Sequence, residues 1–347
     1  MSAGGKEEAV SRIYDPESRS EPDWRSEPDW RSALHQWHRR VQTRLGNAAV
    51  LWMARRWQRM PTARADRIGV AIGTLMRRVS PRHARIVMTN LRLAFGGEKS
   101  EGELKEIARA CYRHLGRCLM EFIRLSAMTA EDIKELAELR GLENLRGAIE
   151  RGRGAILLTG HLGNWEVAGS RVAVEGYPLS VIARAQRDNE ITQYVRQTRE
   201  AMGMRVLHRE VAVRGALRAL RNNELVGILL DQNAGDEGVF VDFFGRLAST
   251  APGAAAFALT TGAEVLPTYG WRNADGRHTV VIEGAVPLVQ TGDRNRDILE
   301  NTARYTKIIE EKVRAHPEQW FWLHKRWKAR PPEEGGGVAR ASRSSRQ

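Results

Sequence analysis

The spacing of apolar residues divides the chain into a helical first part and an alternating second part. An early helical stripe recurs at three- and four-residue steps: Leu34, Trp37, Val41, Leu45, Ala48 and Trp52. Residues 62 to about 150 are predicted to form several helices, including one over 101–126. From Gly154, short apolar runs predict strands at 155–159, 179–184, 204–207 and 225–230. Helices are predicted between them at 165–175, 189–202 and 211–222.

The pattern continues to a last long helix. Pro252 opens a helix of small residues that stops at Gly262. Strands at 264–272 and 277–284 are predicted to pair through the turn Asn273-Ala-Asp-Gly276, and a helix follows at 295–315. Alternating strands and helices predict an α/β fold, with a mixed central sheet flanked by helices and an N-terminal helical region.

Both ends of the chain have low complexity. Residues 1–32 contain the tandem repeat Ser20-Glu-Pro-Asp-Trp-Arg25 and Ser26-Glu-Pro-Asp-Trp-Arg31, and no apolar core of a secretory signal. We expect this segment to be a disordered extension, and residues 331–347, rich in Gly, Ser and Arg, to be a disordered tail. Residues 61–330 then form the main domain.

Residues 33–60 are predicted to form a basic amphipathic helix that associates with a membrane. Six arginines surround the apolar stripe: Arg39, Arg40, Arg44, Arg55, Arg56 and Arg59. The most apolar part, Leu45 to Ala54, is well short of the roughly 20 residues that a spanning helix needs. A helix of this kind suits the membrane interface. The alternative is a first helix that packs on the domain, and both can hold.

The charge narrows the class of partner. Lys and Arg number 55 against 42 Asp and Glu, which leaves a net charge of +13. This balance favours anionic partners, although a solvated basic face without function is the alternative. We expect no nucleic acid, because no known binding motif accompanies the arginines. We also expect no metal: Cys111, His114 and Cys118 share one predicted helix without a fourth ligand, which favours core packing.

The strongest candidate chemistry lies between Gly154 and Glu166. His161 follows a predicted buried strand, and Asn164 is placed to cap a helix that carries Glu166 in its first turn. Sites of α/β folds lie at such strand ends. We therefore predict that His161 is a general base whose tautomer Glu166 fixes. The alternative is a loop histidine beside a glutamate that complements the helix dipole.

The sequence lacks the motifs of a serine nucleophile, a zinc protease and a phosphate-binding loop. The chain has no Gly-x-Ser-x-Gly elbow, no His-Glu-x-x-His and no Gly-x-x-x-x-Gly-Lys-Ser/Thr phosphate loop. A histidine base without a nucleophile suits direct attack on an acyl donor by an activated hydroxyl or water.

The frame Gly160-His-Leu-Gly-Asn-Trp-Glu166 resembles the bacterial lipid A biosynthesis acyltransferases, within the wider His-x-x-x-x-Asp/Glu glycerolipid acyltransferase group. Further matching stretches follow in order: Val181-Ile-Ala-Arg184, Tyr194-Val-Arg-Gln-Thr-Arg199, Gly227-Ile-Leu-Leu-Asp231-Gln232, Phe243-Phe-Gly245 with Thr250, Val265-Leu-Pro267, and His316-Pro-Glu-Gln-Trp-Phe-Trp-Leu-His-Lys-Arg-Trp-Lys328. The resemblance covers about residues 35 to 328 and implies a glycerolipid acyltransferase-like fold, with residues 61–330 as the acyltransferase domain.

The resemblance also implies substrate-binding residues. Arg184 and Arg199 are candidates for the oxyanion or a substrate phosphate, the alternative being surface arginines at helix ends. Asp231 and Gln232 end another predicted strand, so the same sheet edge presents them beside His161, where they bind acceptor hydroxyls or cap a loop. Thr250 lines the site or caps the next helix.

Two aromatic stretches have open roles. Phe243 and Phe244 wall an acyl pocket or belong to the core. The closing stretch from Trp320 to Lys328 contacts head groups or phosphate, or is a packed terminal helix. His324 within it is a second possible base, without a strand end to support it.

The implied reaction moves a fatty acyl chain from a thioester of acyl carrier protein, or of coenzyme A, to a hydroxyl of a phosphorylated glycolipid. A lipid A precursor is the first candidate acceptor; a phosphatidylinositol mannoside or lysophospholipid is an alternative. Another possible function is that of a lipid- or carrier-binding protein without catalysis. No cofactor is implied. We expect the protein at a membrane surface, peripheral or monotopic on the cytoplasmic face of the inner (plasma) membrane.

Overall fold

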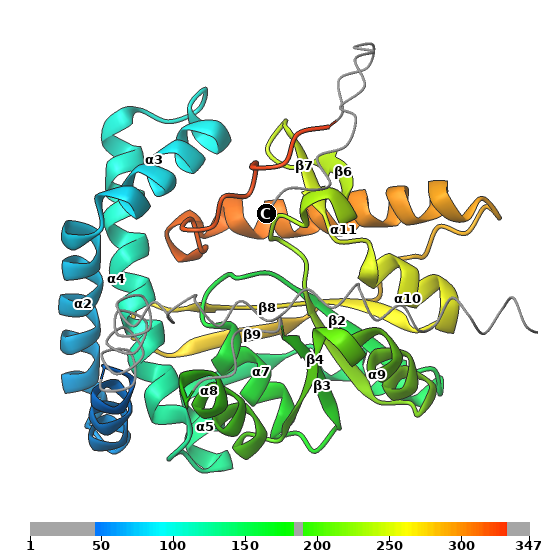
Figure 1. The fold of residues 1–347 in the computed structure, drawn as a ribbon. Helices are drawn as coiled ribbons and strands as arrows, with labels where there is room; N and C mark the ends of the chain where they lie inside the picture. Colours follow the sequence, from blue (N-terminus) through cyan, green and yellow to red (C-terminus); the bar gives the residue numbers. More distant parts are fainter. Residues whose placement is uncertain (1–45, 184–189, 332–347) are drawn as a thin grey trace, which may run out of the picture. The chain divides into compact units, whose positions relative to one another are not determined.

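The computed structural model describes residues 46–183 and 190–331 (Figure 1). The chain divides into two compact units, residues 1–50 and 51–347. Of the first unit only the helical residues 46–50 are described. The predicted extension, nearly all of the predicted tail and Arg184 lie outside the described residues.

A seven-stranded sheet forms the centre of the second unit, with strand order β1-β9-β8-β2-β5-β3-β4. The strands are β1 (Ala137–Arg140), β2 (Ala155–Thr159), β3 (Leu179–Ala183), β4 (Met204–His208), β5 (Leu225–Leu229), β8 (Glu264–Arg272) and β9 (His278–Ile282). β8 and β9 pair antiparallel, and the other neighbours pair parallel. The predicted mixed α/β sheet is confirmed.

Both faces of the sheet are covered by helices, which explains why its central strands are apolar throughout. In β2, Ile156 and Leu158 join one core, whereas Ala155 and Leu157 join the other. The first core is closed by α9 (Arg209–Arg221), α10 (Gly253–Thr261) and α11 (Arg294–Ala315). The second is closed by α5 (Ala130–Leu136), α6 (Leu142–Glu150) and α7 (Trp165–Ala173). Helix α8 (Glu190–Ala201) precedes β4.

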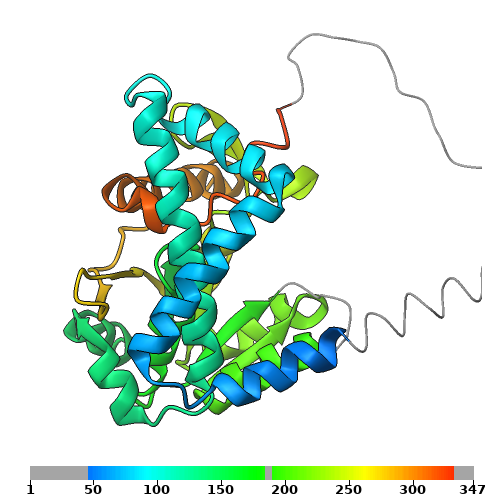
Figure 2. The same ribbon diagram turned by 90° about the vertical axis from the view of Figure 1, so that its left-hand side faces the viewer.

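Long helices before β1 are α2 (Thr62–Val79), α3 (Pro81–Phe95) and α4 (Glu101–Leu125). A capping box of Ser100 and Glu103 starts α4. Helices α2 and α4 run side by side (Figures 1 and 2). They approach so closely that a Cβ on Gly73 would lie 1.9 Å from the Tyr112 carbonyl oxygen, so only glycine fits there.

Three short strands were missed by the sequence prediction. β1 lies where only helices were expected, because four residues are too few for a readable alternation. β6 (Val239–Asp242) and β7 (Leu247–Thr250) form a separate antiparallel pair. Two 3₁₀ turns, η1 (Gly235–Glu237) and η2 (Pro317–Gln319), complete the described chain. Across residues 46–183 and 190–331, no helix is both long and apolar enough to cross a membrane.

Candidate active site

The sheet register brings His161 next to Asp231. β2 and β5 are parallel neighbours, and Thr159 pairs with Leu229 at their carboxyl ends. His161 and Asp231 each follow two residues after these paired positions, so they leave the same edge of the sheet side by side. The sequence prediction that Asp231 lies beside His161 is confirmed.

Asp231 holds His161 through two hydrogen bonds. The backbone N–H of His161 donates to Oδ2 at 2.6 Å, and ring Nδ1 donates to Oδ1 at 2.7 Å. The Trp320 indole also donates to Oδ2, at 2.6 Å. Burial alone raises the pKa of the Asp231 carboxyl, but His161 and Trp320 outweigh it and lower that pKa to about 2. A carboxylate only accepts, so the ring proton lies on Nδ1.

The other ring nitrogen of His161 faces a polar neighbour. Nε2 lies 3.2 Å from the amide nitrogen of Gln232, which can donate to its lone pair. The His161 side chain is 19% exposed, and the rings of Trp165 and Phe321 lie 4.8 Å and 6.0 Å from its ring. The imidazole is thus held by Asp231 and bordered by aromatic side chains.

Glu166 has a different partner from the one predicted. Its carboxylate accepts two hydrogen bonds from the Arg199 guanidinium, at 2.9 Å and 2.5 Å, and one from the Trp165 indole at 3.0 Å. Burial lowers the pKa of Arg199, but Glu166 more than offsets this and raises it. The prediction that Glu166 fixes the His161 tautomer is wrong, because Asp231 already accepts the Nδ1 proton and Arg199 occupies both Glu166 oxygens.

The backbone around His161 follows the predicted design. Asn164 caps α7 and accepts from the backbone N–H groups of Glu166 and Val167, at 3.2 Å and 3.3 Å. Gly163 has φ +58°, and a Cβ there would lie 2.0 Å from the Gly270 carbonyl oxygen. The glycine is therefore needed both for its conformation and for the close approach to β8.

The closing stretch of the domain joins the His161 loop. The backbone N–H of Gly163 donates to the Gln319 carbonyl at 2.9 Å, and that of Phe321 donates to the His161 carbonyl at 3.0 Å. Leu162 and Trp320 form an isolated antiparallel bridge between these two contacts.

The same stretch also binds the Asp231 loop. Besides the Trp320 bond to Asp231, Arg326 donates to the Gln232 carbonyl at 3.2 Å. His324 Nε2 accepts the backbone N–H of Asn233 at 2.8 Å, so this nitrogen is engaged and is not the alternative base. The closing stretch thus fastens both loops that carry the His–Asp pair.

Arg326 explains the position of Thr250. Its guanidinium is fully buried and donates to the Ser249 carbonyl and to Thr250 Oγ1, both at 2.5 Å. Burial lowers the pKa of Arg326 to about 10, although the nearby charge of Asp231 opposes this. Thr250 is itself fully buried and makes no cap to α10, so neither of its predicted roles holds.

Two of the closing aromatic residues are packed in the interior, whereas Phe321 and Trp327 are partly exposed. Trp320 and Trp322 are 1% and 0% exposed, and their rings meet edge to face. The stretch is irregular, so the alternative of a terminal helix is wrong. Phe243 and Phe244 pack in the same core.

Cys111, His114 and Cys118 are buried on α4. Cys118 Sγ lies 3.2 Å from His114 Nε2, within hydrogen-bond range. Burial, with the nearby charge of Arg272, lowers the pKa of His114 to about 4, and burial raises the pKa of Cys111 to about 12. These side chains belong to the packed interior of the helix.

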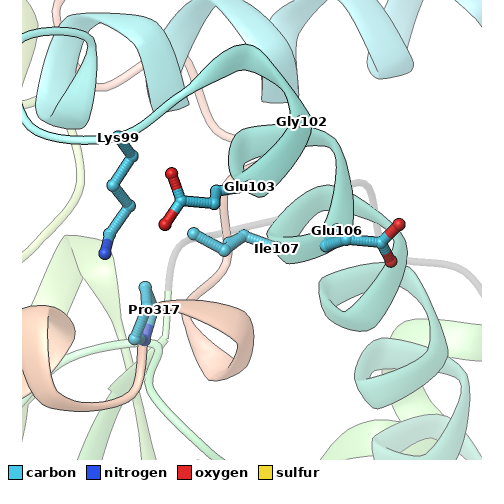
Figure 3. A pocket seen from close by; sticks show the side chains of 6 residues that line it. All are labelled: Lys99, Gly102, Glu103, Glu106, Ile107 and Pro317. Atoms are coloured by element: carbon cyan, nitrogen blue, oxygen red, sulfur yellow. The ribbon is translucent and has the colours of Figure 1, made fainter.

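A hollow at the start of α4 lies apart from the predicted site residues. Its volume is about 620 Å³ (Figure 3), and it is lined by Lys99, Gly102, Glu103, Glu106, Ile107 and Pro317. Glu103 is already engaged in the capping box of α4. This hollow offers no base and no member of the His–Asp pair.

The fold and the site have an arrangement that suits group transfer: a histidine and a carboxylate, hydrogen-bonded to each other, at adjacent strand ends of an α/β sheet. Residues 33–329 match the family described as bacterial lipid A biosynthesis acyltransferase. The chain belongs to this family, which confirms the resemblance found in its motifs, and the protein is an acyltransferase that acts on a glycolipid.

Relatives of two kinds are similar to the chain. A lipid A biosynthesis lauroyltransferase of Escherichia coli (strain K12) is 27% identical over 289 residues, 81% of this chain and 90% of the relative. A palmitoleoyltransferase of lipid A biosynthesis from the same organism is 28% identical, over 82% of this chain and 90% of the relative. A phosphatidylinositol mannoside acyltransferase of Mycobacterium tuberculosis (strain CDC 1551 / Oshkosh) is 28% identical over 220 residues, 62% of this chain and 68% of the relative.

Proposed function

We propose that the protein transfers a fatty acyl chain from a thioester donor to a hydroxyl of a phosphorylated glycolipid, with His161 as the general base. The observation that carries this proposal is the 2.7 Å bond between His161 Nδ1 and Asp231. It leaves Nε2 as the basic nitrogen on a partly exposed side chain.

The proposed reaction uses this geometry. Nε2 of His161 removes the hydroxyl proton while the hydroxyl oxygen attacks the thioester carbonyl carbon. The new C–O bond forms in a tetrahedral intermediate, the C–S bond then breaks, and the imidazolium returns its proton to the leaving thiolate. The anionic Asp231 stabilises the positive charge that His161 carries between these steps.

Gln232 is proposed to hold the acceptor hydroxyl. Its amide lies 3.2 Å from the basic nitrogen of His161, where the hydroxyl must come. An acceptor that displaces this contact gains the Gln232 amide as a hydrogen-bond partner. Gln232 therefore keeps the substrate-binding role that the sequence predicted, whereas Asp231 becomes the carboxylate that orients the base.

We assign different roles to the two predicted arginines. Arg199 is neutralised by Glu166, so we propose that this pair joins α7 to α8 beside the base rather than binding substrate phosphate. Arg184 keeps its predicted role at the oxyanion or phosphate, on the basis of the family motif. Glu166 reaches His161 through Trp165, whose indole donates to Glu166 and whose ring packs edge to face against the His161 ring.

Donor and acceptor are proposed from charge and from the relatives. The net charge of +13 suits an acidic acyl carrier protein, and also the phosphates of coenzyme A. The lipid A enzymes of Escherichia coli support a lipid A precursor as acceptor. The mycobacterial relative supports a phosphatidylinositol mannoside as the second candidate. Both acceptors support a position at the cytoplasmic face of the inner membrane, to which the predicted basic helix at 33–60 would attach the enzyme.

The test is transfer of a labelled acyl chain from acyl carrier protein, and separately from coenzyme A, to each acceptor in detergent micelles. We expect the lipid A precursor to be acylated by the wild type and not by His161→Ala. Preference for phosphatidylinositol mannoside would select the second acceptor. Binding of lipid without transfer to any acceptor would contradict the proposal and favour a binding protein.

A further inference from the structure

A buried carboxylate lies behind the His161 loop, outside the site described above. Glu121 on α4 is 8% exposed. Arg272 on β8 donates to it with both terminal nitrogens, one of them at 2.6 Å, and His278 Nε2 on β9 lies 3.1 Å from Oε1. A charge in such a place is costly unless every oxygen is satisfied, and here both are.

One connection from Glu121 to the loop runs through Asn164. The Asn164 side chain is 3% exposed, and its Nδ2 donates to Glu121 Oε2 at 2.7 Å. The same side chain caps α7 with its oxygen. Since the amide plane is fixed at both ends, Glu121 decides where the first turn of α7 begins relative to His161, three residues before the cap.

A second connection runs through the backbone of Arg272. Its N–H donates to Gln319 Oε1 at 2.8 Å, and its carbonyl accepts from Gln319 Nε2 at 3.0 Å. The Gln319 carbonyl in turn accepts the Gly163 N–H at 2.9 Å. The two connections from Glu121 thus reach the loop at Gly163 and at Asn164, adjacent residues that leave only Leu162 between them and His161.

We propose that Glu121 is a positioning residue that sets the geometry of the His161 loop through Asn164 and Arg272. Glu121 touches no reacting atom. Its positioning role rests on the proposed function, in which His161 is the base. Tertiary contacts of this kind control rate because a shift of about 1 Å at the base costs on the order of a hundredfold.

The first test is a double-mutant cycle on kcat with Glu121→Gln and Asn164→Ser, using labelled acyl carrier protein and a lipid A precursor. Serine keeps the cap of α7 but is too short to reach Glu121, and it leaves the ion pair with Arg272 in place. Asn164→Ser is expected to lower kcat about a hundredfold with little change in KM, and the double variant is expected to be no worse than the poorer single variant.

Asp297→Asn is the matched control. Asp297 is a buried carboxylate in the first turn of α11 that accepts hydrogen bonds from Thr291 and Gly292. Its loss therefore perturbs the fold without touching the His161 loop. Its kcat should stay within about twofold of wild type. A kcat of Asn164→Ser equally close to wild type, or strictly additive effects of the two substitutions, would overturn the proposal.

A second readout does not depend on turnover. The Nδ1 proton of His161, bonded to Asp231, should give a downfield proton resonance that His161→Gln removes. We expect this resonance to be lost or broadened in Asn164→Ser and Glu121→Gln and kept in Asp297→Asn. An unchanged resonance in Asn164→Ser would overturn the positioning role. A wild type that has the resonance but acylates no lipid would instead contradict the proposed function alone.

Discussion

Asp231 accepts hydrogen bonds from both the backbone N–H and the ring Nδ1 of His161, at 2.6 Å and 2.7 Å. The two residues are 70 positions apart in the chain and become neighbours because β2 and β5 pair in parallel. The carboxylate therefore fixes the loop and the tautomer together, which a residue on the following helix cannot do.

Replacing Asp231 by Asn should abolish most of the activity. Asparagine offers an NH₂ group where the ring needs an acceptor, so His161 takes the wrong tautomer. We expect kcat to fall about 10³- to 10⁴-fold, as for other histidine bases that lose their carboxylate. Labelled acyl transfer measures this. Glu166→Gln is the control and should cost less than about tenfold; the opposite ranking would make Glu166 the orienting carboxylate.

The Glu166–Arg199 pair should act as one unit in stability. Both side chains are mostly buried, and the pair is bidentate. Glu166→Gln and Arg199→Met should each lower the free energy of unfolding by about 1–3 kcal/mol and show strong coupling in urea denaturation.

The exposed pair of Arg304 and Glu300 on α11 is the comparison for the double-mutant cycle on Glu166 and Arg199. Its coupling should not exceed about 0.5 kcal/mol, because solvent screens both charges. Equal coupling for the two pairs would mean that the Glu166–Arg199 pair is no stronger than an ordinary surface contact.

Gln232→Ala should weaken acceptor binding. The amide that faces His161 Nε2 is lost, along with the hydrogen bond proposed for the acceptor hydroxyl. One neutral hydrogen bond corresponds to about a tenfold rise in the KM of the acceptor. Kinetics at varied acceptor concentration measure it, with the donor held saturating. A fall in kcat at unchanged KM would place Gln232 in the chemical step instead.

Arg326→Met should destabilise the enzyme and its Asp231 loop together. The substitution removes the donor to the buried Thr250 hydroxyl and one of the two donors to the buried Ser249 carbonyl, which keeps the Ala234 N–H. We expect the free energy of unfolding to fall by about 2–5 kcal/mol, measured by urea denaturation. Arg326→Lys keeps the charge but lacks the planar fork, so it should recover only part of the loss. Full recovery by lysine would mean that charge alone matters.

Stability should fall between pH 6.5 and pH 4 because of His114. Its pKa is about 4 in the folded protein, chiefly through burial, against 6.5 when unperturbed. In this interval the unfolded state binds a proton that the folded state does not, so the free energy of unfolding decreases as the pH falls. The full effect is about 3 kcal/mol. His114→Gln should flatten this part of the stability profile, and an unchanged slope would contradict the assignment.

The sequence by itself predicted most of the strands and helices, and it placed His161 at the end of a strand. The apolar run before Gly160, the capping Asn164 and the turn at Asn273 are local signals, and the structure has β2, α7 and the β8–β9 hairpin there. It also placed Asp231 and Gln232 at the same edge as His161, since parallel strands end at one edge of a sheet.

The tertiary structure decided which carboxylate serves His161. Spacing favoured Glu166, five positions away, but chain separation says nothing about register, and the pairing of Thr159 with Leu229 puts Asp231 against the ring. The burial of Thr250 and Arg326 was equally hidden, because it depends on where the closing stretch packs. The local sequence pattern determines the helices and strands. Contacts between distant segments determine the site, because each contributes little until the others have formed.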